Sequence, residues 1–164
     1  MKKFFVALML IAPTAMFAQK FGHVDTQNIM QSLPEISVIN GELQAKQKEL
    51  ENDLTAMQTE FQRKLDDYEK TQSTMNETKR KETEQELQDM NNKIQQTYQQ
   101  SQQTMQQLQQ EKMGPVYEKV RKAIESVGKA GAYTYIFEVG SALYICTDSK
   151  DLTADVKSEI QKIK

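Results

Sequence analysis

Apolar residues recur at helical spacing through the centre of the chain, residues 38–113, on an otherwise polar background. Gly41 is the only glycine or proline in this range. A narrow apolar stripe of this period is typical of long helices that pack on one another. Two consecutive four-residue spacings, which end at Leu65, form a stutter that locally unwinds a left-handed supercoil. We define the seam by its apolar or small side chains: Ile36, Ile39, Leu43, Leu50, Leu54, Met57, Phe61, Leu65, Tyr68, Met75, Leu87, Met90, Ile94, Tyr98, Ser101, Met105 and Leu108.

The seam weakens between Lys70 and Glu86, where threonine, serine and asparagine accumulate. These residues disfavour helix interiors, so we predict that the chain reverses direction near residues 71–78. Ten of the sixteen residues from Gln95 to Gln110 are glutamine. Low-complexity disorder is the competing interpretation of that segment, but its preserved period favours a helix.

Short apolar segments flank the helical centre. Residues 21–24 suggest a strand followed by an Asp25 cap, and Ser32-Leu33-Pro34-Glu35 resembles a capping box with proline inside it. Gly114-Pro115 predicts a kink or brief break before the helical pattern resumes. Gly128 and Gly131 predict the end of that helix.

The last part of the chain predicts a hairpin and a closing helix. Residues 133–139 and 142–147 are rich in strand-forming residues, and Gly140-Ser141 suits a type II′ turn between them. Thr153 is a candidate cap for a final helix whose apolar stripe contains Val156, Ile160 and Ile163.

These elements predict an α+β fold, mainly α, with a small β-rich body and a long antiparallel helical-hairpin, or coiled-coil, arm. The expected organisation is a signal peptide at 1–18, the N-terminal part of the body at 19–36, the arm at 37–113, and the return helix with the rest of the body at 114–164. So small a sheet has edges that need cover, which predicts self-association. The candidate oligomerisation residues are Val24, Ile136, Phe137, Leu143 and Ile145.

The N-terminus has the organisation of an export signal. Lys2 and Lys3 precede an apolar run that is too short to span a bilayer, and Ala18 offers a cleavage point before Gln19. Without residues 1–18, the chain has 19 basic and 23 acidic residues, so it has no general attraction for nucleic acids or anionic membranes. The expected location is the periplasm, with membrane contact at most peripheral.

Catalytic signals are sparse. The chain has one histidine, His23, and shows no phosphate-binding loop, zinc spacing or nucleophile elbow. Its one cysteine, Cys146, lies in an apolar alternating run that predicts a buried, inert thiol. We therefore expect neither enzymatic activity nor a cofactor nor a metal site.

Several segments together resemble the Skp/OmpH-like family of periplasmic chaperones. They are the opening segment at 21–29, Leu33-Pro34-Glu35, Gly114-Pro115-Val116-Tyr117 and residues 151–156. The resemblance covers essentially the whole mature chain. It implies a homotrimer whose three arms surround a cavity that holds unfolded outer-membrane proteins without ATP. Known members are strongly basic whereas this chain is acidic, which weakens the case for lipopolysaccharide binding and for purely electrostatic capture.

The expected function is therefore that of an ATP-independent periplasmic holdase for unfolded outer-membrane β-barrel proteins. Flexible methionines and aromatic rings on an apolar surface tolerate varied partners. The candidate client-binding residues are Met57, Phe61, Leu65, Tyr68, Met90, Tyr98 and Met105. The alternative is a passive periplasmic coiled-coil scaffold or spacer, which would use the same seam without binding unfolded chains.

Overall fold

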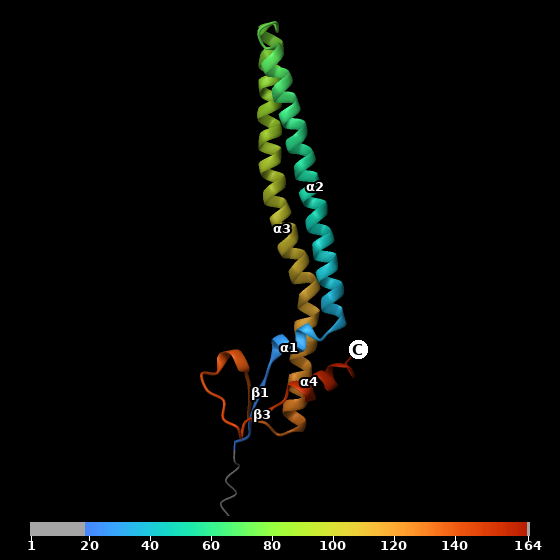
Figure 1. Cartoon of the computed structure of the whole chain (residues 1–164), viewed down its shortest axis with the longest axis vertical. Coiled ribbons are helices and arrows are strands. Elements are labelled where there is room, and N and C mark those ends of the chain that lie inside the picture. Colours follow the sequence, from blue (N-terminus) through green and yellow to red (C-terminus); the bar gives the residue numbers. More distant parts are fainter. Residues whose placement is uncertain (1–18, 164) are drawn as a thin grey trace, which may run out of the picture. The chain divides into compact units, whose positions relative to one another are not determined.

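The computed structural model describes residues 19–163, and these form two units (Figure 1). We call residues 19–26 with 123–163 the body, and residues 27–122 the arm. The predicted signal peptide, residues 1–18, lies outside the described residues.

Two long helices make up most of the arm. After the short α1 (Thr26–Gln31), α2 (Pro34–Thr71) and α3 (Glu77–Ala130) run antiparallel and side by side, and the end of α3 beyond Lys122 belongs to the body (Figure 1). Between them the Thr71 carbonyl accepts a hydrogen bond from Thr74 N–H at 2.9 Å, and the Asn76 side chain caps α3 by accepting from Lys79 N–H at 2.8 Å. The polar segment that is unfavourable for a helix interior therefore contains the turn.

Burial within the arm is concentrated near its two chain ends. Ile29, Leu33, Ile39, Val116 and Val120 are buried there. Between residues 40 and 115 only Leu87 and Ser101 are buried, although the apolar seam runs through the whole range. Most seam side chains therefore keep part of their surface in water.

The body contains a three-stranded parallel sheet. The strands β1 (Phe21–Val24), β2 (Tyr135–Glu138) and β3 (Lys150–Asp151) lie in the order β2-β1-β3. One face of β1 carries Gly22 and Val24, which are buried, and a methyl group added at Gly22 would lie 2.7 Å from Leu152 Cδ1. This close approach explains the glycine in the central strand. The α+β, mainly α fold predicted from the sequence is confirmed.

The predicted hairpin is wrong. After β2 the chain forms a 3₁₀ turn, η1 (Val139–Ser141), and residues 142–149 contain no strand before β3. Both outer strands pair with β1 in parallel, and parallel neighbours cannot be joined by a two-residue turn. Gly140-Ser141 therefore directs the chain away from the sheet and does not connect two paired strands.

Of the kink or brief break predicted at Gly114-Pro115, the break is wrong, because α3 continues through Pro115. Gly114 has no Cβ to meet the proline ring, and nothing lies within 4 Å of where its Cβ would be. Val116 and Val120 are buried in the next turn. Packing of this turn offsets the hydrogen bond that proline cannot donate.

Two predicted helix caps have different roles in the structure. The Ser32 hydroxyl donates to the Ile29 carbonyl at 2.7 Å and so closes α1, while Leu33 holds the N-cap position of α2 without a side-chain hydrogen bond. Thr153 is the first residue of α4 (Thr153–Ile160) and not its cap. Its hydroxyl accepts a hydrogen bond from Asp25 N–H at 3.0 Å, which ties α4 to the end of β1.

A Schellman motif ends α3. Tyr133 N–H donates to the Gly128 carbonyl at 3.0 Å, and Ala132 N–H donates to the Lys129 carbonyl at 3.2 Å. The left-handed residue of the motif is Ala132, with φ of 51°, and not one of the two glycines that predicted the helix end. A left-handed backbone is strained for a residue with a Cβ.

Replacing Ala132 with Gly should stabilise the body by about 0.5–1 kcal/mol, because glycine adopts this conformation without strain. Chemical denaturation followed by circular dichroism would measure the change. Ala130→Gly is the matched control, since Ala130 is exposed and helical, and it should destabilise by about 0.5–1 kcal/mol. Equal destabilisation by both substitutions would contradict the assignment of strain to Ala132.

Candidate functional site: the half-buried seam of the arm

The client-binding candidates of the seam are partly exposed in the structure. Tyr98 has 55% of its surface exposed. The other candidates are half-buried: Met57, Phe61, Leu65, Tyr68, Met90 and Met105. The seam therefore serves as the contact between α2 and α3 and leaves apolar surface open to a further partner.

Polar contacts between α2 and α3 occupy part of the seam near the turn. The Tyr68 hydroxyl donates to Glu84 at 2.5 Å, and this bond raises the pKa of Tyr68. Lys64 pairs with Glu86 at 2.5 Å and lowers the pKa of the Glu86 carboxyl through that hydrogen bond. Among the client-binding candidates, Tyr68 therefore contributes most directly to the contact between α2 and α3.

Opposite charges also connect the helices near the other end of the arm. Lys112 pairs with Glu42 and Lys119 pairs with Glu35, each at 2.7 Å. The Lys119 hydrogen bond lowers the pKa of Glu35. Such pairs contribute little stability individually, but they fix which residues of the two helices face each other.

A groove opens between α2 and α3 in the middle of the arm. Its volume is about 440 Å³. It brings together the candidates Tyr98 and Met105 with seam residues that were not chosen as binding candidates, Leu50, Leu54 and Ser101. The signal for this groove is a small residue, Ser101, at a seam position that elsewhere holds a large side chain.

The arm is mildly acidic overall. Residues 27–122 contain 16 acidic and 13 basic side chains, whereas residues 63–81 contain six basic and four acidic ones. Many of these charges form pairs within one helix turn, such as Arg63 with Glu60 at 2.6 Å and Lys81 with Glu77 at 2.7 Å. Pairs of this kind belong to a solvated helix face.

The outer face of the sheet exposes a stack of aromatic rings. Phe21, Tyr135 and Phe137 stack with centroids 6.0 to 6.3 Å apart. The alternation of β2 places Tyr135 and Phe137 on the same face. We call these three rings the aromatic face of the body.

The oligomerisation candidates differ in exposure. Val24 is buried inside the body, so it cannot make intersubunit contacts while the body is folded. Ile136 and Ile145 are half-buried, whereas Phe137 and Leu143 are exposed. Tyr144, which was not among the candidates, is exposed beside Leu143.

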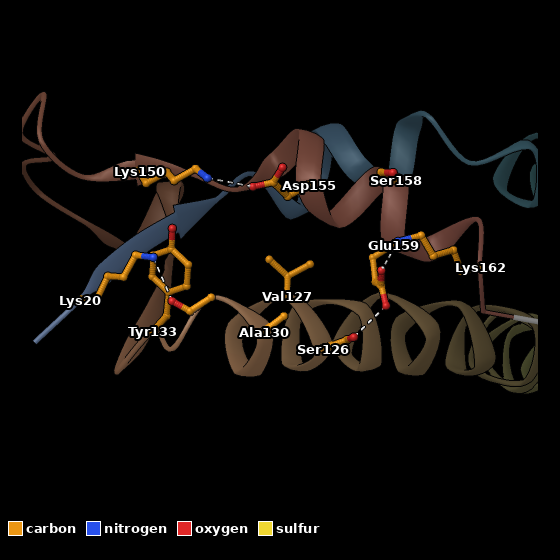
Figure 2. A pocket seen from close by; sticks show the side chains of 11 residues that line it. Lys20, Ser126, Val127, Ala130, Tyr133, Lys150, Asp155, Ser158, Glu159 and Lys162 are labelled. Carbon is orange, nitrogen blue, oxygen red and sulfur yellow. Dashed lines mark hydrogen bonds and ion pairs between the residues drawn. The ribbon is translucent and has the colours of Figure 1, made fainter.

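The body also has a polar pocket of about 420 Å³, shown in Figure 2. Four of its ionic groups form two pairs: Lys150 lies 3.4 Å from Asp155, and Lys162 lies 2.9 Å from Glu159. Ser126 on α3 donates to Glu159 on α4 at 2.7 Å, a bond that joins the two helices. We interpret this pocket as a packing contact between α3 and α4 within the body, and not as a ligand-binding site.

The reactive side chains of the body have structural partners. His23 Nδ1 lies 2.9 Å from Ser149 Oγ. Hydrogen bonds from the side chain and the N–H of Thr153 lower the pKa of the Asp151 carboxyl at the start of α4. Cys146 is exposed, so the prediction of a buried thiol is wrong: its apolar segment forms no strand and does not enter the core.

Within residues 19–163, no cluster of three or more histidine, cysteine or acidic side chains could hold a metal ion. None of the helices in the described part of the chain combines the length and the apolar character needed to cross a membrane.

Comparisons with known proteins place the chain in a family. Residues 20–160 match the model of the family described as outer membrane protein (OmpH-like). No curated protein sequence matches the chain significantly. A crystal structure of an OmpH-like protein from Caulobacter crescentus CB15, described as a candidate outer membrane chaperone, superposes with a TM-score of 0.75 at 14% sequence identity, covering 88% of this chain and 85% of that chain. At that identity the likeness supports the fold, while the family match spans nearly all of the described residues. The chain therefore belongs to the OmpH-like outer membrane protein family.

Proposed function

We propose that this protein is an ATP-independent periplasmic holdase chaperone that binds unfolded outer-membrane β-barrel proteins and keeps them from aggregating. The observation that carries the proposal is the half-buried seam: between residues 40 and 115 only Leu87 and Ser101 are buried. Membership of the OmpH-like family and the fold shared with a candidate outer membrane chaperone support the same role.

The chemistry of the seam suits an unfolded client. Unfolded β-barrel chains expose apolar side chains and unpaired strand edges that aggregate in water. Methionine side chains such as Met57, Met90 and Met105 adapt to apolar groups of different shapes. Many weak contacts of this kind hold a chain without selecting one sequence, and they release it without an energy source.

The proposed assembly is a homotrimer formed through the body. The aromatic face and the exposed Leu143 and Tyr144 supply apolar surface for contact between copies. Three arms around a common cavity would then surround a client. Export through the predicted signal at residues 1–18 would deliver the protein to the periplasm.

The alternative is a passive scaffold or spacer in the cell envelope. Long helices joined by ion pairs, such as Lys112 with Glu42, would serve that role equally well. The partial exposure of Tyr98 and Met105 favours the chaperone, because a spacer gains nothing from apolar surface that remains in water.

Suppression of aggregation separates these two functions. An outer-membrane β-barrel protein unfolded in urea is diluted into buffer with and without this protein, and turbidity is followed. A holdase should suppress the turbidity at about one trimer per client, with no effect of added ATP. If turbidity develops equally with this protein and with an equal mass of serum albumin, the chaperone function is wrong and the spacer interpretation stands.

A further inference from the structure

A small, buried residue, Ser101, lines the groove in the middle of the arm. It occupies the seam position between Tyr98 and Met105. Leu50 and Leu54 line the groove from the opposite helix and are half-buried. Because serine is small, a larger side chain at residue 101 should narrow the groove beside these two leucines.

The groove combines apolar lining residues with a polar rim that carries one negative charge. Its lining includes no lysine or arginine, and its one carboxylate, Glu51, accepts a hydrogen bond from the Gln47 amide at 2.8 Å. Gln102 and Gln106 on α3 complete the rim. Each carboxamide offers both hydrogen-bond donors and an acceptor.

We propose that this groove binds one large apolar side chain of an extended, unfolded polypeptide segment, while the glutamine rim hydrogen-bonds the backbone beside it. This inference rests on the proposed chaperone function and assigns a specific subsite to it. The groove has a volume of about 440 Å³ and is open to solvent. An aromatic or branched aliphatic side chain fits such a space.

Charge favours a peptide over other occupants. A phosphate or a lipid headgroup needs a cation, and the lining provides none while it carries the Glu51 carboxylate. An extended chain brings unpaired N–H and C=O groups, which lose free energy if they leave water without partners. The glutamine amides provide those partners without selecting a sequence.

Filling the groove tests the inference. In Ser101→Leu, the new side chain should occupy the groove beside Leu50 and Leu54, and retained helix content by circular dichroism should show that any overpacking at this buried position leaves the arm folded. Binding of a fluorescent 12-residue peptide with a central Phe between Ser and Thr residues, measured by anisotropy, should weaken about tenfold, as expected when one aromatic side chain loses its burial site. A peptide with Ala in place of Phe should bind the parent about as weakly as the Phe peptide binds the variant.

Gln99→Leu is the matched control. Gln99 is exposed on α3 and does not line the groove, so this change adds the same apolar side chain elsewhere on the helix. It should leave peptide binding unchanged. Ser101→Met, whose flexible side chain fills irregular space with less strain, repeats the test if leucine disturbs the arm.

The outcomes separate the subsite from the general function. If the parent suppresses aggregation but Ser101→Leu and Ser101→Met bind the Phe peptide as tightly as the parent does, the groove inference is overturned and the chaperone function stands. A groove variant that changes only self-association, or only binding to lauric acid, also overturns it, because the occupant would then be a second copy or a lipid. If the parent neither suppresses aggregation nor binds any peptide, the chaperone function itself fails.

Discussion

Replacing Leu143 with Asp should dissociate the proposed homotrimer into folded monomers. The Leu143 side chain is fully exposed in the single chain, so the substitution removes no contact from within the body. In an oligomer that buries Leu143, the same change places an unpaired carboxylate in an apolar contact, which costs several kcal/mol for each of three copies. Phe137→Asp should also dissociate the trimer through the aromatic face, although it additionally removes the ring contacts with Phe21 and Tyr135 within the body.

Light scattering coupled to gel filtration at micromolar concentration measures this effect. The parent should have the mass of a trimer and both variants that of a monomer, with unchanged helix content by circular dichroism. Ala154→Asp is the control, because it introduces the same charge at an exposed position of α4 and should remain trimeric. A monomeric parent, or a Leu143→Asp variant that stays trimeric, would show that the body does not assemble through this surface.

Binding of an unfolded β-barrel protein should depend more on the apolar side chains of the arm than on its charges. The variant that replaces Met57, Met90 and Tyr98 with Ser should bind at least tenfold more weakly, since it removes three partly exposed apolar contacts. Raising the salt concentration should weaken parent binding only about twofold. Exposed charge pairs are screened over about 8 Å at physiological ionic strength, whereas apolar contacts persist.

Fluorescence anisotropy of a labelled, urea-unfolded β-barrel protein diluted into low and high salt gives both comparisons. The matched control replaces Gln58, Gln95 and Gln99 with Ser, because these residues are exposed on the same helices and contribute no apolar contact. Helix content should be retained in both triple variants. Loss of binding in high salt together with normal binding by the Met57, Met90 and Tyr98 variant would mean that capture is electrostatic.

Features that depend on neighbours along the chain were predictable. The period of the seam predicted the long helices, and the cluster of residues unfavourable to helices marks where α2 ends and α3 begins. The end of α3 was also indicated, although the strained position is Ala132 and not a glycine. Sequence motifs distributed from residue 21 to residue 156 indicated the OmpH-like family, which the family match confirms.

Features that depend on distant residues were not predictable from local patterns. The turn residues Gly140-Ser141 between two apolar runs predicted a hairpin, but the second run, which contains Leu143 and Cys146, forms no strand. The capping box predicted at Ser32 does not form, because the Ser32 hydroxyl donates to the Ile29 carbonyl at the end of α1. In the first case the pairing of β2 with the distant β1 replaced the hairpin, whereas in the second the alternative partner of Ser32 is a local one, the Ile29 carbonyl.

The sequence by itself determined the mainly helical architecture and the apolar seam, because helical period and turn-forming residues act over a few neighbouring positions. Only the tertiary structure decided that β1 lies at the centre of a parallel sheet. Its pairing joins Phe21 with Tyr135, and the whole sequence of the arm lies between these two residues. The tertiary structure also decided which seam residues remain accessible. Their exposure depends on the facing helix: the groove lined by Ser101 together with Leu50 and Leu54 could not be inferred from the period of α3 alone.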